Sequence, residues 1–175
     1  VDNPVGTLIT SEENIMEQAV ISGIAHNKDE AKLSLIGVPD EPGIAFKILK
    51  PISTANIEVD MIVQSVSARE GLTNFAFTVH RNDFVGASNI LGHLRKELGA
   101  MAIQSDDKVV KVSLVGIGMR SHAGIAAKMF EVLHGENINI QMISTSEIKI
   151  SVVIDEKYLE LAVRSLHAAF ELDKE

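Results

Sequence analysis

The chain has 175 residues, of which 46% are hydrophobic and 23% charged, so it is long enough for one ordinary domain or two small ones and is not expected to be disordered. Its 24 acidic residues against 16 basic ones give a net charge of -8, which argues against nucleic-acid and membrane partners. There is no cysteine, which excludes disulfides, thiolate metal sites and cysteine nucleophiles and fits a reducing cytoplasm.

In chain order, the first half of the sequence predicts a strand-like segment at 19–25 and then six further elements. Short apolar or alternating runs predict strands, and apolar residues at helical spacing predict helices. The six elements are a strand at 31–38, a helix over 45–52, strands at 59–67 and 73–79, a helix over 84–98 and a short strand at 100–105. We expect Pro51 to kink or shorten the first helix, Asp83 to cap the second and Gly99 to end it.

The second half repeats this order. Ala31–Gly37 resembles Val110–Gly116, 79 residues later, and Asn56–Ile62 resembles Asn137–Ile143, 81 residues later. The elements predicted there are a strand at 109–116, a helix at 122–135, strands at 140–146 and 148–154, and a helix carrying Leu159, Val163, Leu166 and Phe170. The repeat indicates a gene duplication.

A βαββαβ order predicts an α+β fold of the ferredoxin-like type, with two helices on one face of an antiparallel four-stranded sheet. The second copy lacks its sixth element, and the segment at 19–25 has no place in the first copy. We therefore expect the first domain, residues 30–106, to be inserted into the second, which is built from 18–26 plus 109–171.

The usual catalytic signatures are missing. The sequence has no Walker loop, no Gly-x-Ser-x-Gly elbow and no His-Glu-x-x-His motif, and Gly116-Ile-Gly118 departs from a dinucleotide-binding loop. We expect no metal site and no cofactor. A small ferredoxin-like enzyme such as an acylphosphatase relative would need a catalytic Arg and Asn in an anion-binding loop, and only Arg120 approaches this.

The loop between the first strand and the first helix carries the most informative residues. Gly43 at the start of a helix exposes backbone N–H groups, here those of Ile44 and Ala45, that can bind a carboxylate. Asp40 could hold the ammonium group of a free α-amino acid, and Gln64 its polar side chain. The alternative is that Asp40 only caps the helix and Gly43 only makes the turn, and both interpretations remain open from the residues alone.

Four segments together closely resemble the regulatory region of bacterial aspartate kinase, a tandem of ACT domains. They are residues 39–45, 56–67, 112–124 and 139–152, and the similarity extends from about residue 18 to 171. The resemblance implies two ferredoxin-like ACT domains, the first inserted into the second. It also implies an allosteric sensor for threonine and lysine that exerts feedback inhibition on the ATP-dependent phosphorylation of aspartate.

The resemblance also implies which residues bind the effectors. Those carried over for threonine are Asp40, Gly43, Ile44, Ala45 and Gln64, with Asn139 and Ile140 contributed across an interface with a partner chain. Those carried over for a second effector, or for the interface that transmits it, are Asp60, Ser67, Ser121, His122, Thr145 and Ser146.

The expected partners are a second copy of the chain, forming a homodimer through the ACT domains, and the kinase catalytic domain or subunit. Nothing in the sequence matches that kinase domain, which would bind ATP and aspartate, so this chain is expected to have no catalytic residues. Residues 1–17 look like the end of a preceding kinase domain or the lead-in of a free subunit. The alternative is the amino-acid-sensing module of another biosynthetic enzyme.

Overall fold

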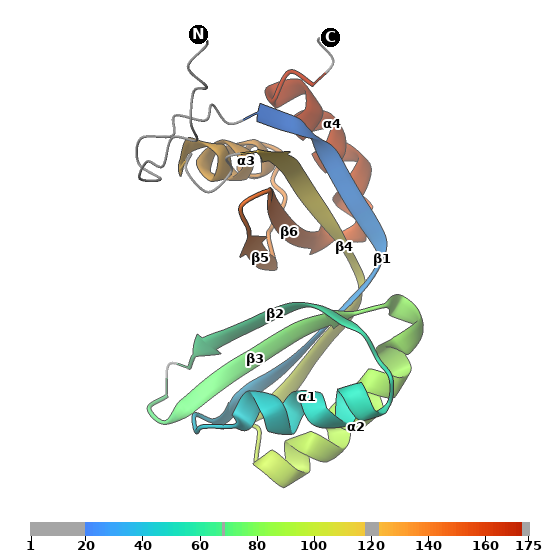
Figure 1. Ribbon diagram of the computed structural model, residues 1–175, viewed down its shortest axis with the longest axis vertical. Coiled ribbons are helices and arrows are strands. Elements are labelled where there is room, and N and C mark those ends of the chain that lie inside the picture. Colours follow the sequence, from blue (N-terminus) through green and yellow to red (C-terminus); the bar gives the residue numbers. More distant parts are fainter. Residues whose placement is uncertain (1–19, 68, 118–122, 173–175) are drawn as a thin grey trace, which may run out of the picture.

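The computed structural model describes residues 20–67, 69–117 and 123–172, and the predictions made for residues 1–17 and 118–122 lie outside these ranges. Six strands form one antiparallel sheet in the order β2-β3-β1-β4-β6-β5 (Figure 1). In chain order the elements are β1 (Val20–Pro39), α1 (Ile44–Thr54), β2 (Val59–Val66), β3 (Leu72–Val79), α2 (Phe84–Leu98), β4 (Ala102–Ile117), α3 (Ala123–Gly135), β5 (Met142–Thr145), β6 (Lys149–Asp155) and α4 (Leu159–Ala169).

Two long strands, β1 and β4, run through the whole molecule. Residues 20–27 of β1 pair with 111–117 of β4, and residues 32–36 pair with 102–106. The prediction of separate strands at 19–25 and 31–38, and again at 100–105 and 109–116, is therefore wrong. The charged stretches between them interrupt the hydrophobic pattern, but backbone pairing continues through them with register shifts on either side of Glu30.

The molecule has two lobes, each with its own core. We call the part around the first core, residues 31–106, the first lobe, and residues 20–27 with 109–117 and 123–172 the second lobe. The largest fully buried side chains in the first are Leu33, Leu35, Ile48, Ile52, Phe75, Phe77 and Leu91, and those in the second are Leu114, Met129, Leu133, Ile154 and Leu166. Each core lies between one face of the sheet and two helices, as the ferredoxin-like prediction requires.

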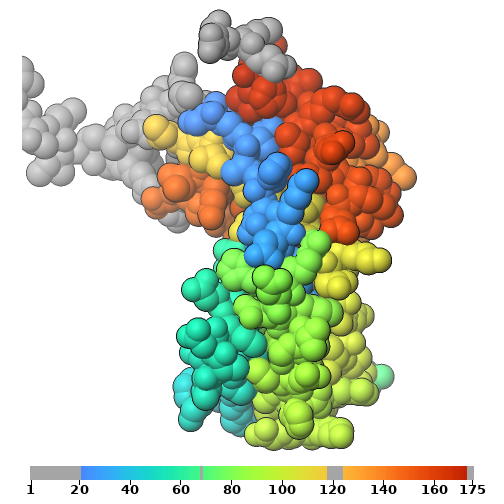
Figure 2. All heavy atoms as spheres, turned by 90° about the vertical axis from the view of Figure 1, so that its right-hand side faces the viewer, coloured from blue at the N-terminus to red at the C-terminus, as the bar shows by residue number. Residues whose placement is uncertain are grey.

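The other faces of the two half-sheets turn toward each other. Met61, on β2, packs with Val109, Met142 and Val153, which belong to the second lobe. Figure 1 shows the helices on the outside of the molecule and the sheets inside. In Figure 2, β1 (blue) lies on the surface between α4 (red) and the first lobe (green). In the described part of the chain, no helix is long and apolar enough to cross a membrane.

The helix ends only partly follow the sequence. Gly99 ends α2 in the left-handed conformation, as predicted, with φ of 67°. Asp83 occupies the N-cap position of α2, but within the described residues its side chain makes no capping hydrogen bond, because a 3-10 turn at Arg81–Asp83 leads into the helix instead. Helix α1 continues through Pro51 to Thr54.

The duplication is visible in the backbone. Asn56 and Asn137, which correspond in the two copies, have φ of 56° and 55° and follow equivalent helices. Asparagine tolerates this left-handed conformation better than most residues, so both copies leave their first helix through the same tight turn.

Gly37 shapes the end of β1 that leads to the Asp40 loop. Its φ is 65°, its N–H donates to Asn74 Oδ1 at 2.9 Å, and a Cβ there would lie 2.5 Å from Met101 Sδ. We expect Gly37→Ala to lower the free energy of unfolding, by about 1–2 kcal/mol for the left-handed backbone alone. Urea denaturation measures this loss. The double variant Gly37→Ala/Met101→Ala should recover only the part due to the clash, and full recovery would contradict the role of φ.

Candidate functional site

The loop before α1 has an exposed acid next to a helix N-terminus. Asp40 is exposed, and its N–H donates to the carbonyl of Gly71 at 2.9 Å, which ties the loop to the β2–β3 hairpin. Gly43 lies at the N-cap of α1 with φ of 93°, and among the described residues no side chain caps this helix. Because the first turn also contains no acidic residue, the positive end of the helix dipole is not neutralised.

Two further contacts show which charged and N–H groups of this loop are already paired. Lys47 pairs with Glu41 at 2.6 Å, so Glu41 already has a cationic partner. The N–H of Ile44 donates to the carbonyl of Glu41 at 3.2 Å, a long hydrogen bond that closes the turn. Of the two N–H groups named from the sequence, that of Ile44 is therefore partly engaged within the loop.

Gln64 lies on the same face of the sheet as α1. Its Cα partner on β3 is Phe75, whose side chain is buried under the helices, and directly opposite residues share a face. Because β2 is an edge strand, Gln64 remains exposed. The structure therefore puts Asp40, Gly43, Ile44, Ala45 and Gln64 on the helix side of the first lobe.

Asn139 and Ile140 do not join these residues within one chain. Both precede β5 in the second lobe, where Asn139 is exposed and Ile140 is partly buried. Ile140 lines a groove of about 490 Å³ whose other wall includes Val63 and Ser65. These two residues alternate with Gln64 along β2 and face the opposite side of the sheet.

The residues named for a second effector are dispersed in one chain. Asp60 is near the start of β2, whereas Ser67 follows its other end and accepts a hydrogen bond from the N–H of Arg69 at 3.3 Å. Thr145 ends β5, and Ser146 closes the β5–β6 turn, where its N–H donates to the Lys149 carbonyl at 2.8 Å. Ser121 and His122 lie outside the described residues.

The sequence analysis missed an ion cluster at the junction of the lobes. Lys111 Nζ lies 3.0 Å from Glu30 Oε1 and also binds Asp60 Oδ2. The side chain of Glu30 is only 2% exposed, and its Oε2 atom has no hydrogen-bond partner among the described residues. One ammonium group therefore serves two carboxylates, of which Glu30 is buried and Asp60 is 45% exposed.

The pKa directions follow from this crowding. Burial raises the pKa of Glu30, and the Lys111 ammonium offsets this only in part. For Asp60, burial acts in the same sense, but the hydrogen bond and charge of Lys111 outweigh it and lower the pKa. For Lys111, burial favours the neutral form, but the two carboxylates outweigh it and raise the pKa. Burial and the shared ammonium therefore move the pKa values of the two carboxyl groups in opposite directions.

A second group of charged side chains, here called the His80 bridge, lies beside the Lys111 cluster. His80 Nδ1 is 3.1 Å from Asp29 Oδ2, and its Nε2 is 3.4 Å from Glu58 Oε2. These groups and the Lys111 cluster border a cavity of about 330 Å³. Among the described residues, however, no three acidic or histidine side chains converge closely enough to hold a metal ion.

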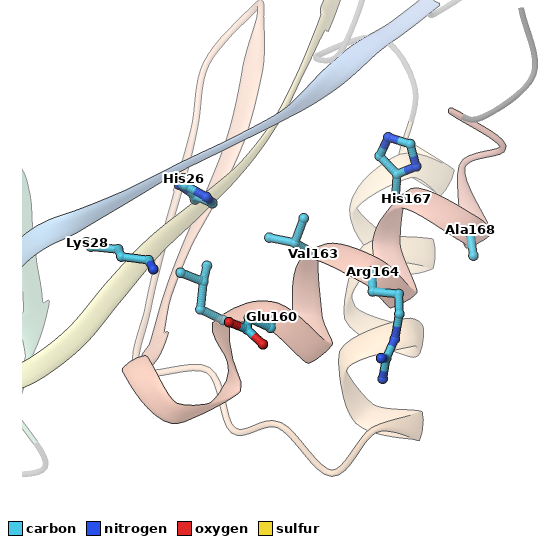
Figure 3. Close-up of a pocket in the computed structure, with 8 residues that line it drawn as sticks. His26, Lys28, Glu160, Val163, Arg164, His167 and Ala168 are labelled. Carbon is cyan, nitrogen blue, oxygen red and sulfur yellow. The ribbon is translucent and has the colours of Figure 1, made fainter.

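A further hollow, of about 490 Å³, lies between β1 and α4 (Figure 3). Lys28 extends toward the hollow, whereas the guanidinium of Arg164 points away from β1 in this view. None of the effector-site residues predicted from the sequence lines it. The candidate site therefore remains the α1 loop with β2.

Comparison with known proteins defines the class first. The ACT domain family matches residues 33–99, and a second ACT domain family matches residues 112–170. These ranges fall in the first and second lobes respectively, so each lobe contains an ACT domain.

Relatives then define the kind of ACT protein. The chain is 68% identical over 169 residues to the aspartate kinase of Pseudomonas fluorescens (strain SBW25), covering 96% of this chain but 41% of that protein. It is 55% identical to a chain of the crystal structure of aspartokinase alpha and beta subunits, with a TM-score of 0.80 and coverage of 87% of this chain and 99% of that chain. The regulatory subunit of aspartate kinase from Thermus thermophilus, in its ligand-free form, is 39% identical with a TM-score of 0.79, covering 86% and 98%. The chain belongs to the aspartate kinase family, as the ACT regulatory part of such a kinase.

The His80 bridge predicts a pH-dependent contribution to stability. Asp29 first and Glu58 second raise the pKa of His80 above its ordinary value of 6.5, so the folded state favours the protonated ring. The stabilisation is therefore complete below the ordinary pKa and is lost as the pH rises through the raised pKa. We expect His80→Gln to cost more stability at about pH 5 than at about pH 8, measured by urea denaturation.

The control for this prediction is the background Asp29→Asn/Glu58→Gln, which removes both carboxylates. There, His80→Gln should cost the same at the two pH values. A difference that persists in this background would mean that the carboxylates are not its cause.

Proposed function

We propose that this chain binds threonine, with lysine as a second effector, and so transmits feedback inhibition to a cytoplasmic kinase part that phosphorylates aspartate with ATP. The observation that carries the proposal is the uncapped N-terminus of α1 beside the exposed carboxylate of Asp40. The sequence resemblance to aspartate kinases supplies the choice of threonine and lysine.

The α1 loop suits a free amino acid because it offers opposite charges side by side. The α-carboxylate would meet the N–H groups at Gly43–Ala45, helped by the helix dipole. The ammonium group would meet Asp40, because Glu41 is already paired with Lys47. The hydroxyl of threonine would reach the amide of Gln64, which stands on the same face of the sheet.

We also propose that the two ACT domains are residues 30–106 and residues 18–26 plus 109–171. Two separate hydrophobic cores support this division. The pairing of 20–27 with 111–117, outside the first lobe, also supports it. Asn139 and Ile140 would then come to the threonine site from the second domain of a partner chain, and the residues named for the second effector would line the same interface.

Threonine binding tests the site directly. Isothermal titration of the chain should give saturable heat with threonine. Asp40→Asn should weaken binding about tenfold or more, because a hydrogen bond to a charged group contributes about 1.5–3 kcal/mol. Gln64→Ala should weaken it about two- to tenfold, because a hydrogen bond between neutral groups contributes about 0.5–1.5 kcal/mol. Asp107→Asn and Gln104→Ala are matched controls, since both residues are exposed on β4. Wild-type affinity in Asp40→Asn and Gln64→Ala would refute the site, and no heat with either amino acid would refute the effector assignment.

The proposed homodimer has a separate test. Phe46 and Ile62 are 65% and 51% exposed on α1 and β2, where the resemblance puts the partner chain. We expect Phe46→Asp to lower the mass measured by light scattering from dimer to monomer, because a charge there would be buried without a partner. Val85→Asp, on α2 and 68% exposed, is the matched control. Equal masses for the two variants would contradict this interface.

A further inference from the structure

Strand β2 begins with an irregularity beside the second lobe. Its pairing with β3 passes from Val59↔Val79 to Ile62↔Phe77, so β2 has one residue more than β3 in this interval, as in a β-bulge. The N–H of Met61 donates to the side chain of Thr78, at 3.2 Å. The start of β2 is therefore held less by the sheet ladder than the rest of the strand.

Side chains of the second lobe hold the start of β2, where backbone pairing is irregular. Lys111 lies on β4 in the second lobe, and its ammonium binds Asp60 in the bulge. The same ammonium binds Glu30, at the point where β1 passes from one lobe to the other. Next to Asp60, Met61 packs against Val109, Met142 and Val153. One side chain thus connects β2, the crossing strand and the second lobe.

Other polar contacts also join the lobes, and one of them is a hydrogen bond from Arg81 Nη2 to the Val109 carbonyl at 3.1 Å. Arg81 Nη1 pairs with Glu156 at 2.9 Å, but their side chains are 36% and 41% exposed, and water screens such pairs. Lys32 donates to the neutral amide of Gln141 at 3.1 Å. Lys111 is 15% exposed and Glu30 is 2% exposed, so water screens this pair less, whereas Asp60 is 45% exposed. Removing Lys111 would leave Glu30 buried without a counter-charge.

We propose that Lys111 fixes the relative orientation of the two lobes and makes it sensitive to any ligand that moves β2. The first part of the proposal, that Lys111 fixes the orientation of the lobes, rests only on the contacts at the junction between them. The second part rests on the proposed function, because β2 carries both Asp60 at the bulge and Gln64 at the threonine site four residues later. A ligand that draws Gln64 toward α1 would then pull on the bulge and, through Lys111, on β4.

The first part is tested without any amino acid. The chain has no cysteine, so Lys96→Cys on α2 and Glu131→Cys on α3 provide one spin label on each lobe of the full chain. Electron paramagnetic resonance should give a narrow distance distribution in this background, and Lys111→Met should broaden and displace it. Lys108→Met is the matched control, because Lys108 is an exposed lysine on the same strand. The same distribution for Lys111→Met and Lys108→Met would overturn the proposal.

Lys111→Met could fail to fold because of the charge left on Glu30. Glu30→Gln/Lys111→Met removes both charges together and keeps the test decisive, with circular dichroism to confirm the fold. This variant should retain wild-type secondary structure and still show the broadened distribution. A narrow, undisplaced distribution in the folded double variant would also overturn the proposal.

The second part is tested with threonine. Coupling between sites usually changes affinity by about 5–150-fold, so saturating threonine should displace the distance distribution of the labelled wild type measurably. In Glu30→Gln/Lys111→Met, calorimetry should still detect threonine binding, but the displacement should be lost. Absence of threonine binding in the wild type would refute the proposed function alone, whereas binding with an equal displacement in both proteins would refute the coupling role of Lys111.

Discussion

The pairing of β1 with β4 is the constraint on which the rest of the molecule depends. Because the two strands stay together from Val20↔Ile117 to Ile36↔Ala102, each lobe builds its sheet outward from the same central pair. The first lobe adds β3 and β2 on the β1 side, and the second adds β6 and β5 on the β4 side. Neither lobe can move far without bending strands that belong to both.

On the proposed function, this arrangement would put the binding site and the lobe junction at opposite ends of β2. The candidate site lies at the rim of the first lobe, where Gly37 and Gly43 turn the chain from β1 into α1 and where β2 is an unpaired edge. The junction lies at the other end of β2, where a bulge meets Lys111. Since an eight-residue strand connects the two places, β2 would be a short physical route from the proposed ligand to the rest of the protein.

Much of the fold could be predicted from the sequence, because each element carries its own local signal. The βαββαβ order, the hairpin at Gly71 and the end of α2 at Gly99 follow from hydrophobic spacing and glycine positions. The continuity of β1 and β4 could not be predicted, since the charged residues around Glu30 and Asp106 resemble a boundary. The same charged stretch hides the burial of Glu30, whose partners Asp60 and Lys111 are distant in sequence.

The candidate site, like the fold, could be predicted from the sequence only in part. Gly43 could be predicted from turn chemistry to begin a helix, and it lies at the N-cap of α1. The binding role of Asp40 and Gly43 stays a prediction. Gln64 could be predicted to lie on a strand, but its face depends on the β2 bulge, which has no marker in the sequence. The roles of Asn139 and Ile140 depend on a second copy of the chain, so they stay predictions.

The shared strands also impose an order on folding during synthesis. Every strand and helix of the first lobe is complete once the ribosome has passed residue 106, whereas residues 20–27 must wait for 111–117. During that interval Ile21 and Ile24, which later pack against the second core, remain in an unpaired strand. Such edges are where nascent chains associate wrongly, so the duplicated architecture leaves the earliest part of β1 without a partner for longer than any other strand segment.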